Sequence, residues 1–110
     1  MKVLVPDGFP RGGLPDDVEF AAEGAEFAVP TSSAMAERLA DLPELRVVQV
    51  LSAGVDWVQP HVPDGVTLCN GGDTREAEAA AQALARAQVL RHRAGLPLRH
   101  VVSGPARPGR

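Results

Sequence analysis

The feature that most limits the fold is a series of short apolar runs, each of which stops at a proline, a glycine or a polar turn. Such runs, apolar on nearly every position, are typical of parallel strands that are covered on both faces. The runs are Lys2–Val5, the weaker Val18–Phe20, Glu26–Val29, Arg46–Leu51 and Val66–Cys69. They predict an α/β domain with a parallel sheet of four to five strands, helices on its faces and right-handed crossovers.

Two of the segments between these runs carry helix signals. Ser33 is placed to cap a helix with one apolar stripe, and Pro43 ends it. The stripe consists of Met35, Leu39 and Leu42. Val55–Val58 predicts a second, short helix that begins directly after the fourth run and ends before Pro60.

The composition changes near Asn70. Residues 1–70 hold four basic and eleven acidic residues, whereas residues 71–110 hold seven arginines and three acids. Ala, Arg, Gly and Pro fill 24 of the last 40 positions. The sequence therefore predicts a partial domain over residues 1–70, an Ala/Arg-rich helical segment over 71–95 and a disordered tail over 96–110.

The helical segment is predicted to run from Thr74 to Ala94. Asp73 and Glu76 stand at its N-cap and N3 positions, and Gly95 and Pro97 close it. Its large apolar residues do not share one stripe, so we expect the helix to form without docking firmly. These residues are Leu84, Val89 and Leu90.

Charge and composition exclude several classes of function. The net charge is -3, so the chain has no general basic field for nucleic acid or an anionic membrane. No stretch approaches the length of a membrane span, and the apolar run after Met1 is too short for a signal peptide. Cys69 is the one cysteine, which suits a reducing compartment. We expect a cytoplasmic protein.

The most informative candidate site is the turn after the fourth run. There a buried strand gives way to the small residues Ser52, Ala53 and Gly54 and then to a predicted helix. In open α/β sheets, ligands bind beyond the carboxyl ends of strands, and free amides at a helix start attract anions. The amides of Ala53, Gly54 and Val55 are the candidate site for a small carboxylate. The alternative is a tight turn in which Asp56 merely caps the helix.

Other conspicuous residues favour structural roles. No glycine-rich phosphate cradle occurs, and the histidines and Cys69 lack metal-ligand spacing. Asp7-Gly8 is interpreted as a turn, Cys69 as a small buried hydrophobe and Trp57 as an anchor for the short helix. The following are interpreted as ordinary surface residues: His61, His92, His100 and the pairs Arg91/Arg93 and Arg107/Arg110.

Two stretches carry a resemblance to a known family. Leu42–Val58 (LPELRVVQVLSAGVDWV) and, after it, Pro63–Asn70 (PDGVTLCN) resemble the N-terminal part of D-isomer-specific 2-hydroxyacid dehydrogenases, the phosphoglycerate dehydrogenase-like group. The opening Met1–Asp7 (MKVLVPD) fits as well. The resemblance is strong over residues 42–70, moderate over residues 1–41 and weak beyond them.

The resemblance implies a flavodoxin-like substrate-binding domain, here incomplete, in which Ala53, Gly54 and Val55 hold the carboxylate of a 2-oxo or 2-hydroxy acid. In the family, a Rossmann domain across a cleft binds NAD or NADP and supplies an Arg, an acid and a His. Those positions have no counterpart in the 110 residues. We therefore expect a truncated dehydrogenase that takes up no cofactor and is inactive alone.

Two further expectations follow from this interpretation. Residues 71–110 form an out-of-frame or degenerate end of such a gene, because GC-rich coding sequence read out of frame gives an excess of Ala, Arg, Gly and Pro. The surface that the missing domain would cover becomes available for a homodimer or another association. The alternative function is a non-enzymatic module for small-carboxylate binding or protein association.

Overall fold

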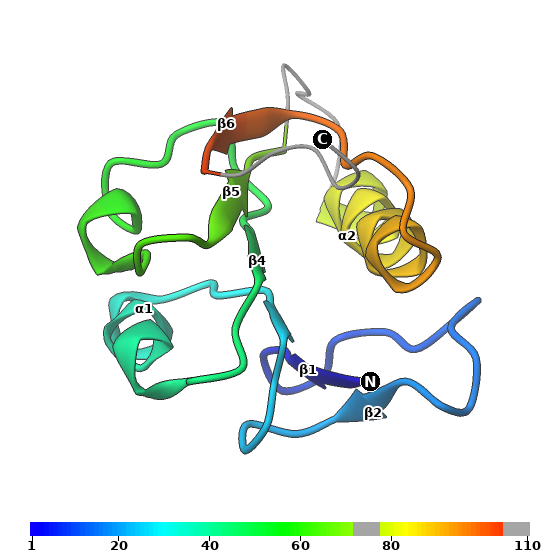
Figure 1. The fold of residues 1–110 in the computed structure, drawn as a ribbon. Coiled ribbons are helices and arrows are strands. Elements are labelled where there is room, and N and C mark those ends of the chain that lie inside the picture. The colour runs from blue at the N-terminus through cyan, green and yellow to red at the C-terminus, as the bar shows by residue number, and fades with distance from the viewer. Residues whose placement is uncertain (72–77, 105–110) are drawn as a thin grey trace.

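A computed structural model, which describes residues 1–71 and 78–104, has an α/β fold built on one six-stranded sheet. The strands are β1 (Lys2–Leu4), β2 (Glu19–Phe20), β3 (Phe27–Ala28), β4 (Val47–Gln49), β5 (Thr67–Cys69) and β6 (Val101–Ser103). Their order is β2-β1-β3-β4-β5-β6, and the first five pair in parallel (Figure 1). The parallel part has the strand order of flavodoxin-like sheets. The predicted α/β class is confirmed.

The first helical segment is capped one residue earlier than predicted. Helix α1 spans Ser33–Glu37 and is followed by a 3-10 turn, η1 (Leu39–Asp41). Its cap is Ser32, whose Oγ accepts a hydrogen bond of 3.2 Å from the Met35 amide. An N-cap hydroxyl reaches the amide two or three positions further on, so either serine was a candidate, and the prediction of Ser33 is wrong.

Helix α2 (Glu78–Arg93) packs against the sheet, contrary to the prediction that this helix does not dock firmly. Ala85 and Val89 are buried in the core, and Ala81 is nearly so. The prediction counted only large apolar residues, but small alanines let the helix lie close to the strands. The residues predicted to cap it, Asp73 and Glu76, lie outside the described residues. No described helix is long and apolar enough to span a membrane.

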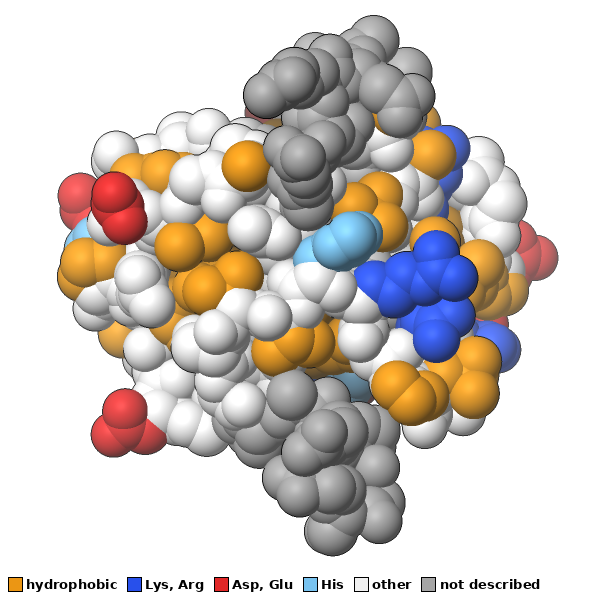
Figure 2. All heavy atoms as spheres, turned by 90° about the horizontal axis from the view of Figure 1, so that it is seen from above, with side chains coloured by type: hydrophobic (Ala, Val, Ile, Leu, Met, Phe, Trp, Pro, Cys, Tyr) orange, Lys and Arg blue, Asp and Glu red, His pale blue; other side chains and the backbone are white. Residues whose placement is uncertain are grey.

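Strand β6 replaces part of the predicted disordered tail. It pairs antiparallel with β5, and Cys69 lies opposite Val101. Pairing with the otherwise open edge of β5 satisfies backbone groups on both strands, which overrides the local composition. Seen from above β6, hydrophobic side chains are interspersed with polar ones, and a basic group lies on the side of α2 (Figure 2). Residues 105–110 of the predicted tail lie outside the described ranges.

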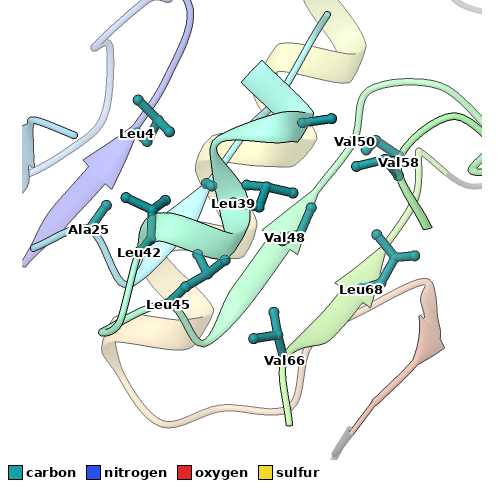
Figure 3. Close-up of a cluster of buried hydrophobic side chains, with 12 residues drawn as sticks. Leu4, Ala25, Leu39, Leu42, Leu45, Val48, Val50, Val58, Val66 and Leu68 are labelled. Carbon is teal, nitrogen blue, oxygen red and sulfur yellow. The ribbon is translucent and has the colours of Figure 1, made fainter. Parts of the chain in front are cut away.

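Successive residues of the strands point to opposite faces and build two buried clusters. Val48 and Leu68 face the cluster under α1, which Figure 3 shows, whereas Val47 and Cys69 face the cluster under α2. The first cluster contains Leu4, Ala25, Ala28, Ala36, Leu39, Leu42, Leu45, Val48, Val50, Val58, Val66 and Leu68. The second contains Val3, Phe9, Val18, Phe27, Val29, Val47, Cys69, Ala85 and Val89. Both faces of the sheet are covered within this chain.

The docking of α2 predicts unequal effects for two neighbouring truncations. Val89 is 1% exposed and Leu90 is 38% exposed. We expect Val89→Ala to lower the free energy of unfolding by roughly 1 to 2 kcal/mol, because two buried methyl groups are lost. Leu90→Ala should change it by less than about 0.5 kcal/mol. Urea unfolding followed by circular dichroism measures both, and equal effects would mean that α2 is not docked.

Candidate functional site

The candidate site lies at one edge of the sheet because the five parallel strands all end there. The chain leaves this edge through the turns that follow β1, β3, β4 and β5 (Figure 1). Strand β6 runs the other way, so its beginning lies at the same edge, where the Asn70 amide donates to the His100 carbonyl at 3.0 Å. Ligands of open α/β sheets bind at this carboxyl edge.

The three predicted site residues lie together in the turn that follows β4. Ala53 and Gly54 are exposed, and Val55 is half-buried. The Ser52 hydroxyl donates to the Gly54 carbonyl at 2.9 Å and closes the turn. Within the described ranges, no group accepts a hydrogen bond from the amides of Ala53, Gly54 or Val55. Three successive N–H groups at the carboxyl edge of the sheet therefore have no acceptor within the described residues.

The predicted helix after this turn does not form. The amides of Val58 and Gln59 both donate to the Val55 carbonyl, and only a 3-10 turn, η2 (Gln59–His61), follows. Pro60 has no N–H to extend a helix from Val55, but it lies inside η2, so the prediction that the helical segment ends before Pro60 is wrong. A helix dipole therefore does not contribute to the site. An anion at this turn would be attracted by the local peptide dipoles alone.

The expected capping role of Asp56 is not observed either. Its side chain is exposed and makes no hydrogen bond with another described residue. Trp57, by contrast, is partly buried and packs against the cluster under α1, so it attaches this segment to the core, although the helix that it was predicted to anchor does not form. Val55 and Val62 pack against the same cluster. These contacts fix the far side of the turn to the core.

The near side of the turn is fixed by the end of β5. The Asn70 side chain donates from Nδ2 to the Ala53 carbonyl at 3.0 Å, and the Gly71 amide donates to the Ser52 carbonyl at 2.8 Å. A Cβ at Gly71 would stand 2.5 Å from the Leu51 carbonyl oxygen, so only glycine allows this close approach. A Cβ at Gly54, by contrast, would have no neighbour within 4 Å, and Gly54 has no left-handed backbone, so the packing of the protein itself does not require glycine there.

A separate cavity of about 290 Å³ opens at the same edge, where β1 and β2 end. Asp7, Gly8, Phe9 and Phe20 are among its lining residues, and none comes from the turn after β4. The Phe9 amide donates to the Pro6 carbonyl at 3.1 Å, and Gly8 has a φ of 79°. The interpretation of Asp7-Gly8 as a turn is confirmed. In the sheet, β3 separates this cavity from the candidate site.

The opposite edge of the sheet holds charged pairs that sequence reasoning missed. His92 Nε2 lies 2.9 Å from Glu26 Oε1, and Arg93 Nε donates to Asp17 Oδ2 at 2.8 Å. The hydrogen bond from Arg93 lowers the pKa of the Asp17 carboxyl. His92 and Arg93 were predicted to be ordinary surface residues. Their side chains instead form pairs that link the end of α2 to the sheet. A cavity of about 340 Å³ lies beside them.

Cys69 and the histidines do not form a reactive centre within residues 1–71 and 78–104. Cys69 is fully buried at the end of β5, as predicted, and burial raises the pKa of its thiol to about 12. His61 lies in η2 and His92 in α2, and these two elements lie on opposite faces of the sheet. No group of three His, Cys, Asp or Glu side chains in this described part could hold a metal ion.

Comparison with protein-family models, with curated proteins and with solved structures found no match for this chain. The resemblance to D-2-hydroxyacid dehydrogenases therefore stays a prediction from the residues quoted above.

The raised pKa of Cys69 predicts slow thiol chemistry in the folded protein. At pH 8 only about one buried thiol in 10⁴ is ionised, and the thiolate is the reactive form. We expect modification by a disulfide reagent to be at least about 100-fold slower in buffer than in denaturing urea. The stability that the neutral thiol contributes is present below about pH 8.5 and falls as the pH rises toward 12. Rapid native-state reaction at pH 8 would contradict the burial.

Proposed function

We propose that this chain binds a small 2-oxo or 2-hydroxy carboxylate at the turn Ser52–Val55, as the substrate-binding part of a D-2-hydroxyacid dehydrogenase-like protein. The observation that carries the proposal is the row of three amides at Ala53, Gly54 and Val55. They lie at the carboxyl edge of a parallel sheet, in two exposed residues and one half-buried residue, and have no acceptor among the described residues.

Physical chemistry supports a carboxylate as the ligand of this turn. Successive backbone N–H groups in a turn form an anion-binding concavity without the need for a charged side chain. A carboxylate offers two oxygens, and hydrogen bonds to a charged acceptor are stronger than those between neutral groups. Asp56 is exposed next to the turn and repels an anion, so binding is expected to be weak and selective for small acids.

The described residues do not fit the NAD or NADP of the family. A dinucleotide needs a glycine-rich turn that leads from a strand into a helix and holds the pyrophosphate at the helix start. Here β1 is followed by the turn Pro6–Phe9 rather than a helix, and α1 is a five-residue helix that follows Pro30 and Thr31. Hydride transfer is therefore proposed only for an assembly in which another polypeptide segment supplies the nucleotide-binding domain.

A second candidate function is a self-contained carboxylate-binding module without redox activity. The observation that favours it is that segments of this chain cover both faces of the sheet. Ala85 and Val89 of α2 close one face, and β6 pairs with β5. A protein that completes its own core in this way does not need a second domain for stability.

Titration with oxalate tests the carboxylate site. We expect the amide resonances of Ala53, Gly54 and Val55 to shift on addition of oxalate. Gly54→Ala should weaken binding about tenfold, because the added methyl group blocks the approach to the amides. The methyl group meets no protein atom within 4 Å, and the Gly54 φ is not left-handed, so the fold should be retained.

Gly12→Ala is the matched control for this titration. A Cβ at Gly12 also meets nothing within 4 Å, and Gly12 lies far along the chain in the loop between β1 and β2. The control should bind oxalate like the parent protein. If oxalate shifts other amides instead, or if Gly54→Ala binds as well as Gly12→Ala, the carboxylate does not bind at the turn after β4.

An assay of NADH oxidation tests the redox part of the proposal. We expect no turnover of glyoxylate or hydroxypyruvate by this 110-residue chain alone, because the described residues do not fit the nicotinamide cofactor. The folded state of the same sample is checked by its amide spectrum. Turnover that scales with protein concentration would show that the chain holds the cofactor itself.

A further inference from the structure

Two glutamine side chains are fully buried between β4 and α2. Gln49 and Gln88 are both 0% exposed, and they join through a 3.0 Å hydrogen bond from Gln88 Nε2 to Gln49 Oε1. A buried amide without partners costs about 1 to 3 kcal/mol, so a pair in the core needs a complete set of hydrogen bonds. Within the described residues, no buried side-chain nitrogen or oxygen is left without a partner.

Backbone groups fix the orientation of both amides. Gln88 Oε1 accepts from the Arg99 amide at 3.0 Å, and Gln88 Nε2 also donates to the Arg99 carbonyl at 2.6 Å. Gln49 Nε2 donates to the carbonyls of Val50 at 2.8 Å and Asn70 at 2.9 Å. A flip of either amide would place oxygen against carbonyl oxygen. The pair therefore has one arrangement, in which Gln49 Nε2 donates to the residue that follows β5.

The hydrogen bonds continue from this pair to the candidate site. Asn70 receives the Gln49 hydrogen bond on its carbonyl, and its own Nδ2 donates to the Ala53 carbonyl at 3.0 Å. The Asn70 amide donates in addition to the His100 carbonyl, one residue beyond Arg99. A continuous set of hydrogen bonds thus runs from Arg99 through Gln88, Gln49 and Asn70 to Ala53.

We propose that the buried pair Gln49–Gln88 positions the turn Ser52–Val55, so that α2 and the segment before β6 set the geometry of the carboxylate site. Gln49, Gln88 and Asn70 are positioning residues, because they act on Ala53 and do not meet the ligand themselves. Polar networks in a core fix one geometry more strictly than apolar packing does. The consequence for ligand affinity rests on the proposed function, whereas the consequence for the turn does not.

The test compares the double variant Gln49→Met/Gln88→Met with Val89→Ala. The double variant replaces both amides with apolar side chains of similar length, which limits the loss of stability, and removes the hydrogen bond to Asn70. Val89→Ala loosens α2 beside Gln88 but leaves every hydrogen bond of the set in place. Amide chemical shifts and hydrogen exchange at Ala53, Gly54 and Val55 are measured without ligand, and oxalate is then titrated.

We expect the double variant to shift the three amides, to speed their exchange and to weaken oxalate binding about tenfold. Val89→Ala should leave the amide shifts unchanged and the affinity within about twofold of the parent. Unchanged amides in the double variant, or equal changes in both variants, would overturn the positioning role. If the parent does not bind oxalate at all, the proposed function fails, and the ligand-free measurements still decide the positioning role.

Asn70→Ala provides a second variant in case the double variant does not fold. Asn70 is half-buried, so its truncation disturbs the core less, but it removes the Nδ2 donor to Ala53. We expect the same shifts at Ala53, Gly54 and Val55 with a smaller loss of stability than for the double variant. Parent-like amides in Asn70→Ala would overturn the last step from Asn70 to Ala53.

Discussion

Parallel pairing is the constraint from which the rest of this structure follows. Because β1, β3, β4 and β5 all run in one direction, the turns after them meet at one edge of the sheet, and the beginnings of these four strands lie at the other. The turn Ser52–Val55 reaches the carboxyl edge for this reason and not because of any property of its own residues. The same constraint brings Asn70 beside it, since β5 is the neighbour of β4.

Local sequence was enough to find the strands and the turn, because both are set by residues close to one another. Val47 and Val48 are β-branched residues, which favour a buried strand. Gly8 and Gly65 indicate turns, because both have left-handed backbones that favour glycine. Whether Val101–Ser103 forms a strand depends instead on pairing with β5, which lies about thirty residues earlier in the chain. Nothing in its own composition distinguishes this segment from a tail.

The misjudged helices show two further limits of local reasoning. For α2, the buried face consists of Ala81, Ala85, Gln88 and Val89, and a count of large apolar residues detects only Val89. Gln88 is recognisable as a core residue only when Gln49 is known to lie opposite it. For Val55–Val58, the first turn satisfies helical hydrogen bonding at Val55, but Pro60 follows too soon for propagation to offset the cost of nucleation.

The packing of residues 78–104 also bears on the origin of the second half of the chain. In an out-of-frame segment, we would not expect Val89 to be buried in the core or Gln88 to form a buried hydrogen bond with Gln49. We would also not expect the next apolar run, Val101–Ser103, to pair with β5. For these residues, the packing counts against a degenerate end and in favour of a segment that belongs to the fold. It also changes what the Ser52–Val55 turn can do. An isolated turn would pay the full ordering entropy on binding an acid, whereas a turn already held at Ser52 and Ala53 by the end of β5 presents its amides in a fixed direction. If the turn binds a carboxylate as proposed, the segment beyond Asn70 contributes to the affinity together with the turn itself.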